Sequence, residues 1–281
     1  MSLTGVVQEN ASILEKGSYV SPGGKTVALR DLVDRAVRGT VLHRPADLDA
    51  LLAARARPEH GATSPRIEIT TETTAEAARR LVEDERERDV VALNFASAKN
   101  PGGGYLRGAK AQEEDLARCS ALYTCQIGHR EYYEANRACG TMLYTDHMLY
   151  SPDVPFFRDE RLTLLEKPFP VSIITAPAPN AGEAAGRKGE AAKVEEVLRS
   201  RARKVLAVAA AHGHRCLVLG AWGCGVFRND PRAVAQAFAL GLEDGAFAGA
   251  FDRVVFAIWE RNPDRPTMRA FASILGAKVE R

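Results

Sequence analysis

Glu113 and Glu114 follow closely after three consecutive glycines, Gly102, Gly103 and Gly104. Glycine backbone can approach a ligand closely and adopt dihedral angles that other residues avoid, and successive amides in such loops bind anions. A pair of carboxyl groups can cleave a glycosidic bond, one by protonating the leaving oxygen and the other by stabilising or activating a nucleophile. We therefore expect a substrate that contains both a diphosphate and a glycosidic bond.

The two glutamates open a predicted helix, in which adjacent side chains point about 100° apart. One carboxylate could then face a glycosidic oxygen and the other a ribose hydroxyl. A carboxyl group beside a second one and near bound phosphate has a raised pKa, which suits a general acid near neutral pH. Without the glycines, the same pair is typical of acidic residues at a helix N-terminus. Asn100, before the glycines, could hold a ribose hydroxyl or cap the loop.

Neither of two common phosphate-binding motifs fits the glycine run. Gly103 and Gly108 have the spacing of a P-loop, but Ala109 follows, and Lys110 comes one position late with no Ser or Thr behind it. The dinucleotide fingerprint GxGxxG needs a glycine where Arg107 stands. A nucleotide-dependent kinase or ATPase is therefore disfavoured, and a different diphosphate loop is required.

A second glycine-rich loop, GAWGCGVF, follows a predicted strand and contains Gly220, Gly223 and Gly225. It could grip the other side of the same diphosphate, and Phe227 at its end could stack on a base or a ribose. The alternative is a tight turn from strand to helix with a phenylalanine in the core. Cys224 has no histidine near it in the sequence, so we interpret it as a small loop residue rather than a nucleophile.

From residue 66 onward the pattern alternates between strand and helix. Apolar runs predict strands at 66–70, 89–97, 170–180, 215–220 and 252–260. Residues 142–159 are expected to form a hairpin, or a strand and a loop. Helical spacing recurs at 75–87, 113–127, 194–213 and 231–245. Alternating units predict a mixed or parallel sheet covered by helices on both faces. Ligands bind beyond the carboxyl ends of such strands, so three loops, 94–104, 174–186 and 217–227, are expected to meet at one edge.

The first part of the chain is expected to form an N-terminal extension. Helical spacing at 31–42 and 47–56 predicts that residues 1–65 are a mostly helical extension packed on a main domain of residues 66–281.

The composition of the 281-residue chain, with 46% apolar and 26% charged residues, is ordinary for a folded soluble protein. The net charge of +2 is too small for sequence-independent nucleic-acid binding, so no direct DNA binding is expected. Five cysteines without a CxxC pair argue against a disulfide scaffold or a structural zinc site and fit a reducing cytoplasm. We identify no signal peptide and no membrane span. The histidine spacings fit no metal site, so neither a metal nor a cofactor is expected.

The Asn-Pro-Gly-Gly-Gly run after a strand, with seven residues before a Gln-Glu-Glu that opens a helix, resembles the signature of the poly(ADP-ribose) glycohydrolases of the compact bacterial type. The segment GAWGCGVFRNDP is similar to the second phosphate loop of that family, and the resemblance extends over residues 66–275. It implies a macrodomain-like fold, which is a three-layer α/β/α sandwich around a mixed sheet. It also implies an ADP-ribose pocket and hydrolysis of the ribose–ribose O-glycosidic bond of poly(ADP-ribose).

The resemblance assigns roles to individual residues. Glu114 would be the catalytic acid and base, and Glu113 would position the ribose hydroxyls. The implied substrate-binding residues are Asn100, Gly102, Gly103, Gly104, Gln112, Ala221, Gly223, Cys224, Gly225, Val226 and Phe227. The implied partners are poly(ADP-ribose), ADP-ribose and poly(ADP-ribosyl)ated proteins, the expected state is a monomer, and the terminal protein-linked ADP-ribose is expected to be spared.

Two rival functions would use the same pocket. A macrodomain that only binds ADP-ribose would not require the Gln112-Glu113-Glu114 triplet, whereas a hydrolase of single ADP-ribose groups on proteins differs only in its leaving group. Substrate assays separate these two from a chain-cleaving enzyme. The sequence leaves open whether chains are cut only from their ends or also internally.

Overall fold

The computed structural model describes residues 2–55, 64–277 and 279–280, so residue 56 at the end of the second expected N-terminal helix lies outside the described ranges. The main sheet has eight strands in the order β10-β4-β9-β8-β5-β7-β6-β3. They are β3 (Val41–His43), β4 (Arg66–Thr70), β5 (Val90–Phe95), β6 (Met148–Arg158), β7 (Leu164–Ala176), β8 (Cys216–Leu219), β9 (Arg253–Ala257) and β10 (Val279–Glu280). A small antiparallel ribbon pairs β1 (Ser18–Val20) with β2 (Thr26–Ala28).

The sheet is mixed, because β6 pairs antiparallel with both β7 and β3, whereas the pairs from β10 to β7 are parallel. Strand β5 lies between β8 and β7. Its residue Ala92 pairs with Val218 of β8, and Phe95 pairs with Ala176 of β7. The carboxyl ends of these three strands are therefore neighbours, and the expected meeting of the three loops is confirmed.

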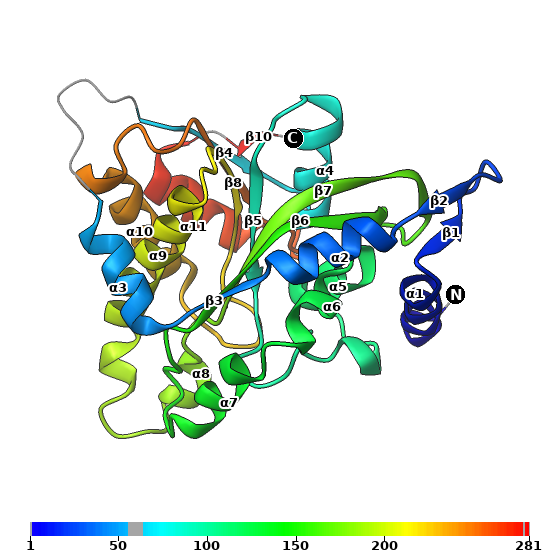
Figure 1. The fold of residues 1–281 in the computed structure, drawn as a ribbon. Helices are drawn as coiled ribbons and strands as arrows, with labels where there is room; N and C mark the ends of the chain where they lie inside the picture. The colour runs from blue at the N-terminus through cyan, green and yellow to red at the C-terminus, as the bar shows by residue number, and fades with distance from the viewer. Residues whose placement is uncertain (1, 56–63, 278, 281) are drawn as a thin grey trace.

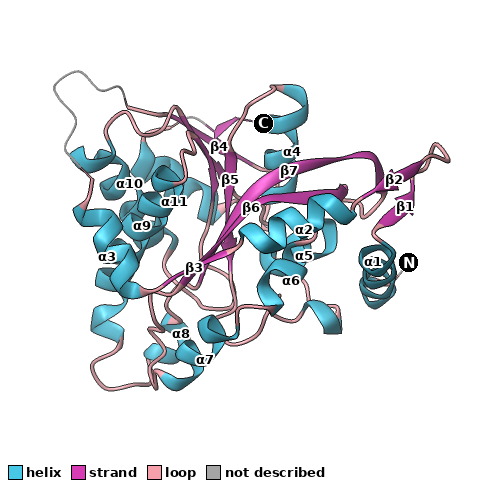
Figure 2. Ribbon diagram, viewed as in Figure 1, coloured by secondary structure: helices cyan, strands magenta, loops and turns pink. Residues whose placement is uncertain are grey.

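Helices cover both faces of the sheet (Figure 1; Figure 2). One layer holds α3 (Pro45–Ala53), α9 (Val194–Ala211), α10 (Pro231–Glu243) and α11 (Pro266–Leu275). The other holds α2 (Arg30–Gly39), α4 (Thr74–Arg79), α5 (Gln112–Cys119) and α6 (Leu122–Ile127), with α1 (Leu3–Lys16) outside it. Two further helices, α7 (Arg130–Ala138) and α8 (Ala181–Ala184), lie together at the bottom of the view in Figure 1. The predicted three-layer α/β/α fold is confirmed.

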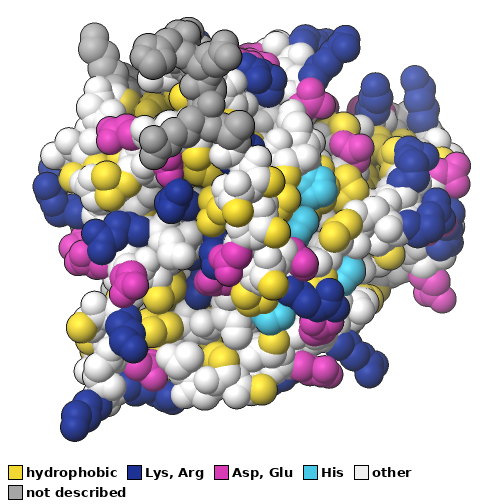
Figure 3. Space-filling model, turned by 60° about the vertical axis from the view of Figure 1, so that its left-hand side comes forward, with side chains coloured by type: hydrophobic (Ala, Val, Ile, Leu, Met, Phe, Trp, Pro, Cys, Tyr) yellow, Lys and Arg dark blue, Asp and Glu magenta, His cyan; other side chains and the backbone are white. Residues whose placement is uncertain are grey.

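The surface in Figure 3 mixes basic and acidic side chains, and no single basic field covers this face. Within the described ranges, no helix combines the length and the apolar character that crossing a membrane requires.

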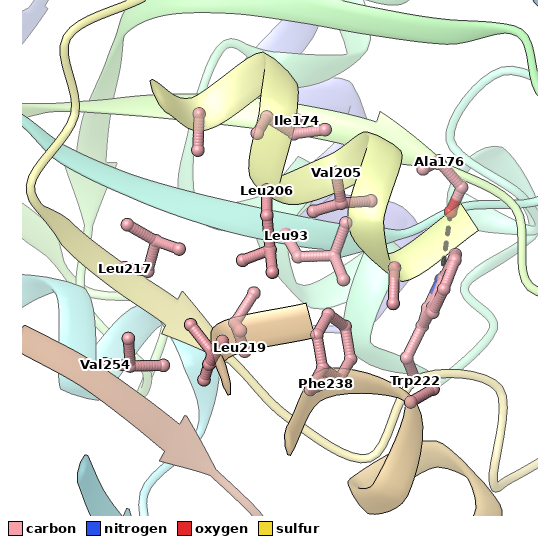
Figure 4. Packing of buried hydrophobic residues seen from close by; sticks show 14 of the residues in the cluster. Leu93, Ile174, Ala176, Val205, Leu206, Leu217, Leu219, Trp222, Phe238 and Val254 are labelled. Carbon is pink, nitrogen blue, oxygen red and sulfur yellow. Dashed lines mark hydrogen bonds between the residues drawn. The ribbon is translucent and has the colours of Figure 1, made fainter. Parts of the chain in front are cut away.

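Beneath the surface, apolar side chains from both helices and strands close the space between α9, α10 and the sheet (Figure 4). Phe238 of α10 and Leu206 of α9 are fully buried there, next to Leu219 of β8. Trp222, which belongs to the second glycine-rich loop, also reaches this core, and its indole Nε1 donates to the Ala176 carbonyl at 3.1 Å. The loop after β8 is thus anchored to the end of β7.

The single helix expected at 113–127 is wrong, because the chain forms two helices, α5 and α6. Ser120 between them has extended backbone angles and forms an isolated bridge to Phe156 of β6. Its hydroxyl donates to the Leu116 carbonyl at 2.7 Å and accepts from the Leu122 amide at 3.2 Å, which supplies partners at both helix ends. The helix expected at 75–87 also differs, since α4 ends at Arg79 and continues as a π-helical turn, Arg80–Asp84.

The first 65 residues contribute to the main sheet. Strand β3 pairs with β6 as the edge strand, with Leu42 opposite Leu149. In this region, Leu29 and Leu48 are fully buried.

Candidate active site

Gln112 ties the start of α5 to the end of β5. Its Oε1 accepts from the Phe95 amide at 2.8 Å, and its Nε2 donates to the Leu93 carbonyl at 2.8 Å and to Thr74 Oγ1 at 3.1 Å. The side-chain amide therefore supplies the hydrogen bonds that a neighbouring strand would otherwise make to the last residues of β5. This arrangement fixes the position of the two glutamates that follow, while the expected contact of Gln112 with substrate stays a prediction.

Glu113 is buried and accepts three hydrogen bonds. The Ser97 amide donates to Oε2 at 2.7 Å, while Asn94 Nδ2 at 3.1 Å and Gln126 Nε2 at 3.0 Å donate to Oε1. Burial raises the pKa of the Glu113 carboxyl to about 7, although these three donors oppose the rise; the neighbouring Glu114 adds to it. Glu113 is thus poised to change charge near neutral pH.

Glu114 faces the glycine run. Its Oε1 accepts from the Gly104 amide at 2.7 Å, and within the described part of the chain its other oxygen, Oε2, has no hydrogen-bond donor. A Cβ atom on Gly103 would stand 2.5 Å from Glu114 Oε1 and 2.9 Å from Glu113 Oε2, and the φ of Gly103 is +59°. Both carboxylates therefore reach the same point of the loop, and only glycine leaves them room.

The amides of the three glycines all donate within the protein. Gly102 donates to Gln126 Oε1 at 3.0 Å, Gly103 to the Asn100 carbonyl at 3.0 Å, and Gly104 to Glu114. This differs from the expectation that these amides would be directed at an anion, because Gln126 and Glu114 already supply acceptors. The exposed Asn100 lies beside the run, and contact of these residues with a substrate stays a prediction.

The second glycine-rich loop has the free amides that the first lacks. Within the described ranges, the N–H groups of Gly225, Val226 and Phe227 donate to no protein acceptor. The loop is held in place by Asn229, whose Nδ2 donates to the Pro179 carbonyl at 2.8 Å and whose amide donates to the Gly223 carbonyl at 3.1 Å. Three successive free amides on a fixed loop can supply hydrogen-bond donors to an anion.

The loops after β7 and β8 touch one another at the site, and Tyr144, which precedes β6, joins them to Lys99 of the loop after β5. The Gly182 amide donates to the Phe227 carbonyl at 3.0 Å. The ring centroids of Tyr144 and Phe227 lie 5.8 Å apart, and the Lys99 ammonium lies 5.9 Å from the Tyr144 centroid. Phe227 is thus part of a small aromatic and cationic rim.

Cys224, Ala221 and Gly223 are partly buried in the second loop, whereas Val226 is 82% exposed. Burial raises the pKa of the Cys224 thiol to about 12, so the thiolate needed for nucleophilic attack is scarce at neutral pH.

The sequence reasoning missed three residues at this edge of the sheet. Gln126 and Asn94 hold Glu113, yet Gln126 lies on a different helix and nothing in the local sequence links the two. Trp259 follows β9 by two residues and is 56% exposed, with the Arg261 guanidinium 5.6 Å from its ring centroid. Its position after a strand end was a signal that could have been used, because β9 is the neighbour of β8.

Comparisons with known proteins agree with this geometry. The family model described as "Microbial-type PARG, catalytic domain" matches residues 7–159. The poly(ADP-ribose) glycohydrolase from Thermomonospora curvata is 48% identical, with a TM-score of 0.91 over 97% of this chain and 98% of that chain. Its complex with the inhibitor ADP-HPD is 48% identical over 96% and 98% of the two chains, with a TM-score of 0.88. The poly(ADP-ribose) glycohydrolase from Deinococcus radiodurans in complex with ADP-ribose is 50% identical over 89% and 98%, with a TM-score of 0.81. A search among curated proteins gave no match.

Proposed function

Because the chain belongs to the family of microbial-type poly(ADP-ribose) glycohydrolases (PARG), it is a glycosidase that releases ADP-ribose from poly(ADP-ribose), and we propose that Glu114 is its general acid and base. The observation that carries this proposal is the orientation of Glu114. Its Oε1 is fixed by the Gly104 amide, and its Oε2 has no donor within the described ranges. One oxygen is therefore positioned by the protein, and the other is available to the substrate.

The proposed reaction has two stages. Protonated Glu114 gives its proton to the leaving ribose oxygen while the C1″–O bond breaks and an oxocarbenium-like centre develops. Ionised Glu114 then takes a proton from water as the water oxygen bonds to C1″. The products are ADP-ribose and the shortened chain, and Glu114 is again protonated.

Glu113 has a different part in the proposal. As a buried carboxylate held by three donors, it cannot turn toward the leaving group, but it can accept a hydrogen bond from a ribose hydroxyl. This contact would fix the sugar against Glu114, and orientation of this kind accounts for a large share of catalytic rate.

The diphosphate of the ADP-ribose unit is proposed to lie on the free amides of Gly225, Val226 and Phe227. Their N–H groups supply the donors. The glycine run at 102–104 is proposed to line the same pocket. The ring of Phe227 would close over a ribose. Ala221, Gly223 and Cys224 would shape the wall of this loop, and Asn100 and Gln112 would complete the ribose side.

The adenine is proposed to stack on Trp259. This exposed indole lies two residues beyond β9, next to the loop that follows β8. A partly exposed aromatic ring at the carboxyl end of the sheet offers a base a face to stack on, which contributes about 1–3 kcal/mol in proteins that bind bases this way.

Poly(ADP-ribosyl)ated proteins are the proposed cellular substrates, and the enzyme is proposed to act as a monomer without contacting DNA. The net charge of +2 and the mixed surface of Figure 3 support the last point. All five cysteines are free, which supports a reducing compartment such as the cytoplasm.

The first experiment compares the wild type with Glu114→Gln on a poly(ADP-ribosyl)ated acceptor, with release of ADP-ribose followed by chromatography. Calorimetric titration with ADP-ribose shows whether the pocket survives the substitution. We expect the wild type to shorten chains and the variant to bind ADP-ribose without cutting. A wild type that binds ADP-ribose and leaves chains intact would identify a reader, or a hydrolase of single ADP-ribose groups, instead.

A further inference from the structure

The first helix, α1, lies against the loop that joins the glycine run to the glutamates, although almost 90 residues separate them in the sequence (Figure 1). Gly108, in the middle of that loop, has a φ of +72°, and a Cβ there would stand 3.3 Å from Thr4 Cγ2 and 3.4 Å from Leu3 Cβ. The loop therefore packs on the surface of α1.

Asn10 of α1 is fully buried at this junction. Its Nδ2 donates to the Arg118 carbonyl at 2.8 Å and to the Tyr105 hydroxyl at 3.4 Å, and its Oδ1 accepts from Arg158 Nε at 2.7 Å. Both amide hydrogens and the oxygen thus have partners. A buried amide with every group paired fixes one relative arrangement of the segments that it joins.

Two of these segments carry the catalytic groups. Tyr105 directly follows Gly104, whose amide positions Glu114, and the buried Tyr105 ring packs at 5.2 Å on that of Tyr123. Arg118 lies one helical turn after Glu114 on α5, and its Nη1 donates to the Ala109 carbonyl at 2.7 Å. Asn10 therefore bonds to both ends of the segment from Tyr105 to Arg118, and this segment sets the distance from the glycine run to the glutamates.

We propose that Asn10 is a positioning residue of the glycohydrolase, which holds the glycine loop and α5 in the register that points Glu114 at the scissile bond. This inference rests on the proposed role of Glu114. It also makes α1 part of the active-site architecture, since the side chain that bonds to Tyr105, Arg118 and Arg158 comes from this helix.

Asn10→Asp isolates the contact that matters. The carboxylate keeps an acceptor for Arg158 and can accept from the Tyr105 hydroxyl, but it has no donor for the Arg118 carbonyl of α5. We expect kcat on poly(ADP-ribose) to fall about tenfold or more, because small misplacements of a catalytic group reduce rate strongly. The Kd for ADP-ribose, measured by calorimetry, is expected to stay within about threefold of the wild type, because the amides of the second glycine-rich loop are untouched.

Ile13→Ala is the matched control for a merely structural effect. Ile13 is a buried residue of α1 that packs in the apolar core, and its apolar side chain takes no part in the hydrogen bonds of Asn10. We expect this variant to lower the Tm and to keep kcat within twofold at a temperature where all variants are folded. An Ile13→Ala variant that loses as much kcat as Asn10→Asp at the same loss of Tm would overturn the proposal.

Tyr105→Phe removes one hydroxyl and tests the same link from the other side. We expect a kcat loss of about threefold, and a further loss when it is added to Asn10→Asp, since the first removes the contact to the glycine loop and the second the contact to α5. If Asn10→Asp does not fold, Tyr105→Phe decides. Wild-type kcat in Asn10→Asp, or in Tyr105→Phe in that case, would overturn the inference. Failure of the wild type to release ADP-ribose, or full activity of Glu114→Gln, would instead overturn the proposed function.

Discussion

Glu114 Oε1 lies 2.5 Å from the point at which a Cβ on Gly103 would stand, so the Glu114 carboxyl group fills the space that a side chain at position 103 would need. The glycine at 103 is therefore required by the glutamates themselves, in addition to any demand from a diphosphate. The spacing between the glycines and Glu114 is explained by this contact and by the Gly104 amide, which donates to the same oxygen.

Gly103→Ala is expected to lose activity through displacement of both carboxylates. The new methyl group meets Glu114 Oε1 and Glu113 Oε2, and alanine at a φ of +59° costs about 1–2 kcal/mol of strain. We expect kcat to fall about 100-fold and the free energy of unfolding to drop by about 1–3 kcal/mol. Steady-state kinetics and urea denaturation measure the two effects.

Gly128→Ala is the matched control for this substitution. Gly128 has a φ of −75°, and no atom lies within 4 Å of the position that its Cβ would take, so alanine should fit without cost. Wild-type kcat in Gly103→Ala, or an equal loss in Gly128→Ala, would contradict this account of the glycine run.

The pH dependence of the reaction should follow Glu113. Burial raises the pKa of this carboxyl to about 7, and the ionised form accepts a ribose hydroxyl more strongly than the protonated form, so kcat/KM should fall as the pH drops below about 7. Gln126→Glu keeps an acceptor for the Gly102 amide but places a second carboxyl group against Glu113. The acid limb should then move up by about one pH unit.

The control for this shift is Gln8→Glu, the same substitution on the exposed surface of α1. It should leave the pH profile unchanged. A profile that is flat between pH 6 and 8 in the wild type, or one that Gln126→Glu does not move, would show that Glu113 does not act as the ionised acceptor.

The ionisation of Glu113 should also lower the free energy of unfolding as the pH rises, whereas it raises kcat/KM. The pKa of Glu113 is higher in the folded chain than its ordinary value of 4.5, so the folded state binds the proton more tightly between these two pH values. Its contribution to the free energy of unfolding is therefore present below about pH 4.5 and is lost as the pH rises through about 7. In urea denaturation, the free energy of unfolding of Glu113→Gln should rise relative to that of the wild type as the pH increases from 5 to 8. A difference that stays constant with pH would contradict the raised pKa.

Much of the fold could be predicted from the sequence because its central strands are short apolar runs with clear ends. Strands β5, β8 and β9 and helices α9 and α10 all lie within the ranges that periodicity gives. The break between α5 and α6 could not be predicted, because it depends on the bridge from Ser120 to Phe156, a residue far along the chain. The same holds for β3, whose partner β6 follows it by about 100 residues.

The residues of the site also divide into those that the sequence predicts and those that it does not. The glutamates and the second glycine-rich loop are visible as local motifs, whereas the residues that hold them are not. Gln126, Asn94 and Asn10 are ordinary amides in sequence, and their importance comes from hydrogen bonds to groups on other elements. The amides of the first glycine run were expected to face an anion, and that could be corrected only when their acceptors were known.

Two glycines of the second loop should respond differently to alanine. A Cβ on Gly223, where φ is +72°, would stand 2.6 Å from Ala178 Cβ and would also collide with Asn229, whereas nothing lies within 4 Å of the corresponding position on Gly225. Gly223→Ala should therefore weaken ADP-ribose binding at least tenfold and lower the Tm, because the loop loses its anchor. Gly225→Ala should keep the wild-type Tm. Calorimetry and thermal unfolding test the pair, and equal Tm losses would contradict the anchoring role of Asn229.

Trp259→Ala tests the adenine platform. Loss of a stacking ring should raise the Kd for ADP-ribose about tenfold and leave the affinity for ribose 5-phosphate unchanged, since that ligand has no base. Trp259→Phe should recover most of the affinity. Leu240→Ala, another exposed apolar residue, serves as the control. Equal weakening of both ligands in Trp259→Ala would place the base elsewhere.

Acid should loosen the contact between β3 and the end of α9 through three histidines. His212 stacks on Tyr150 at 3.6 Å between ring centroids, its Nε2 lies 3.2 Å from that of His43, and His214 Nε2 is bonded to the Tyr150 hydroxyl at 2.8 Å. Burial, with the adjacent imidazoles of His43 and His214, lowers the pKa of His212 to about 4. Burial also lowers the pKa values of His43 and His214, with Asp47 acting against the shift at His43.

A histidine whose pKa is lower in the folded than in the unfolded chain takes up protons preferentially on unfolding. Its contribution to the free energy of unfolding is therefore complete above about pH 6.5 and is lost as the pH falls toward 4. His212→Asn removes this group while keeping a residue suited to the end of α9. Urea denaturation at pH 7, 6 and 5 should show a shallower loss of stability in the variant than in the wild type. Parallel losses would mean that the imidazole cluster is already solvated and does not hold β3 to α9.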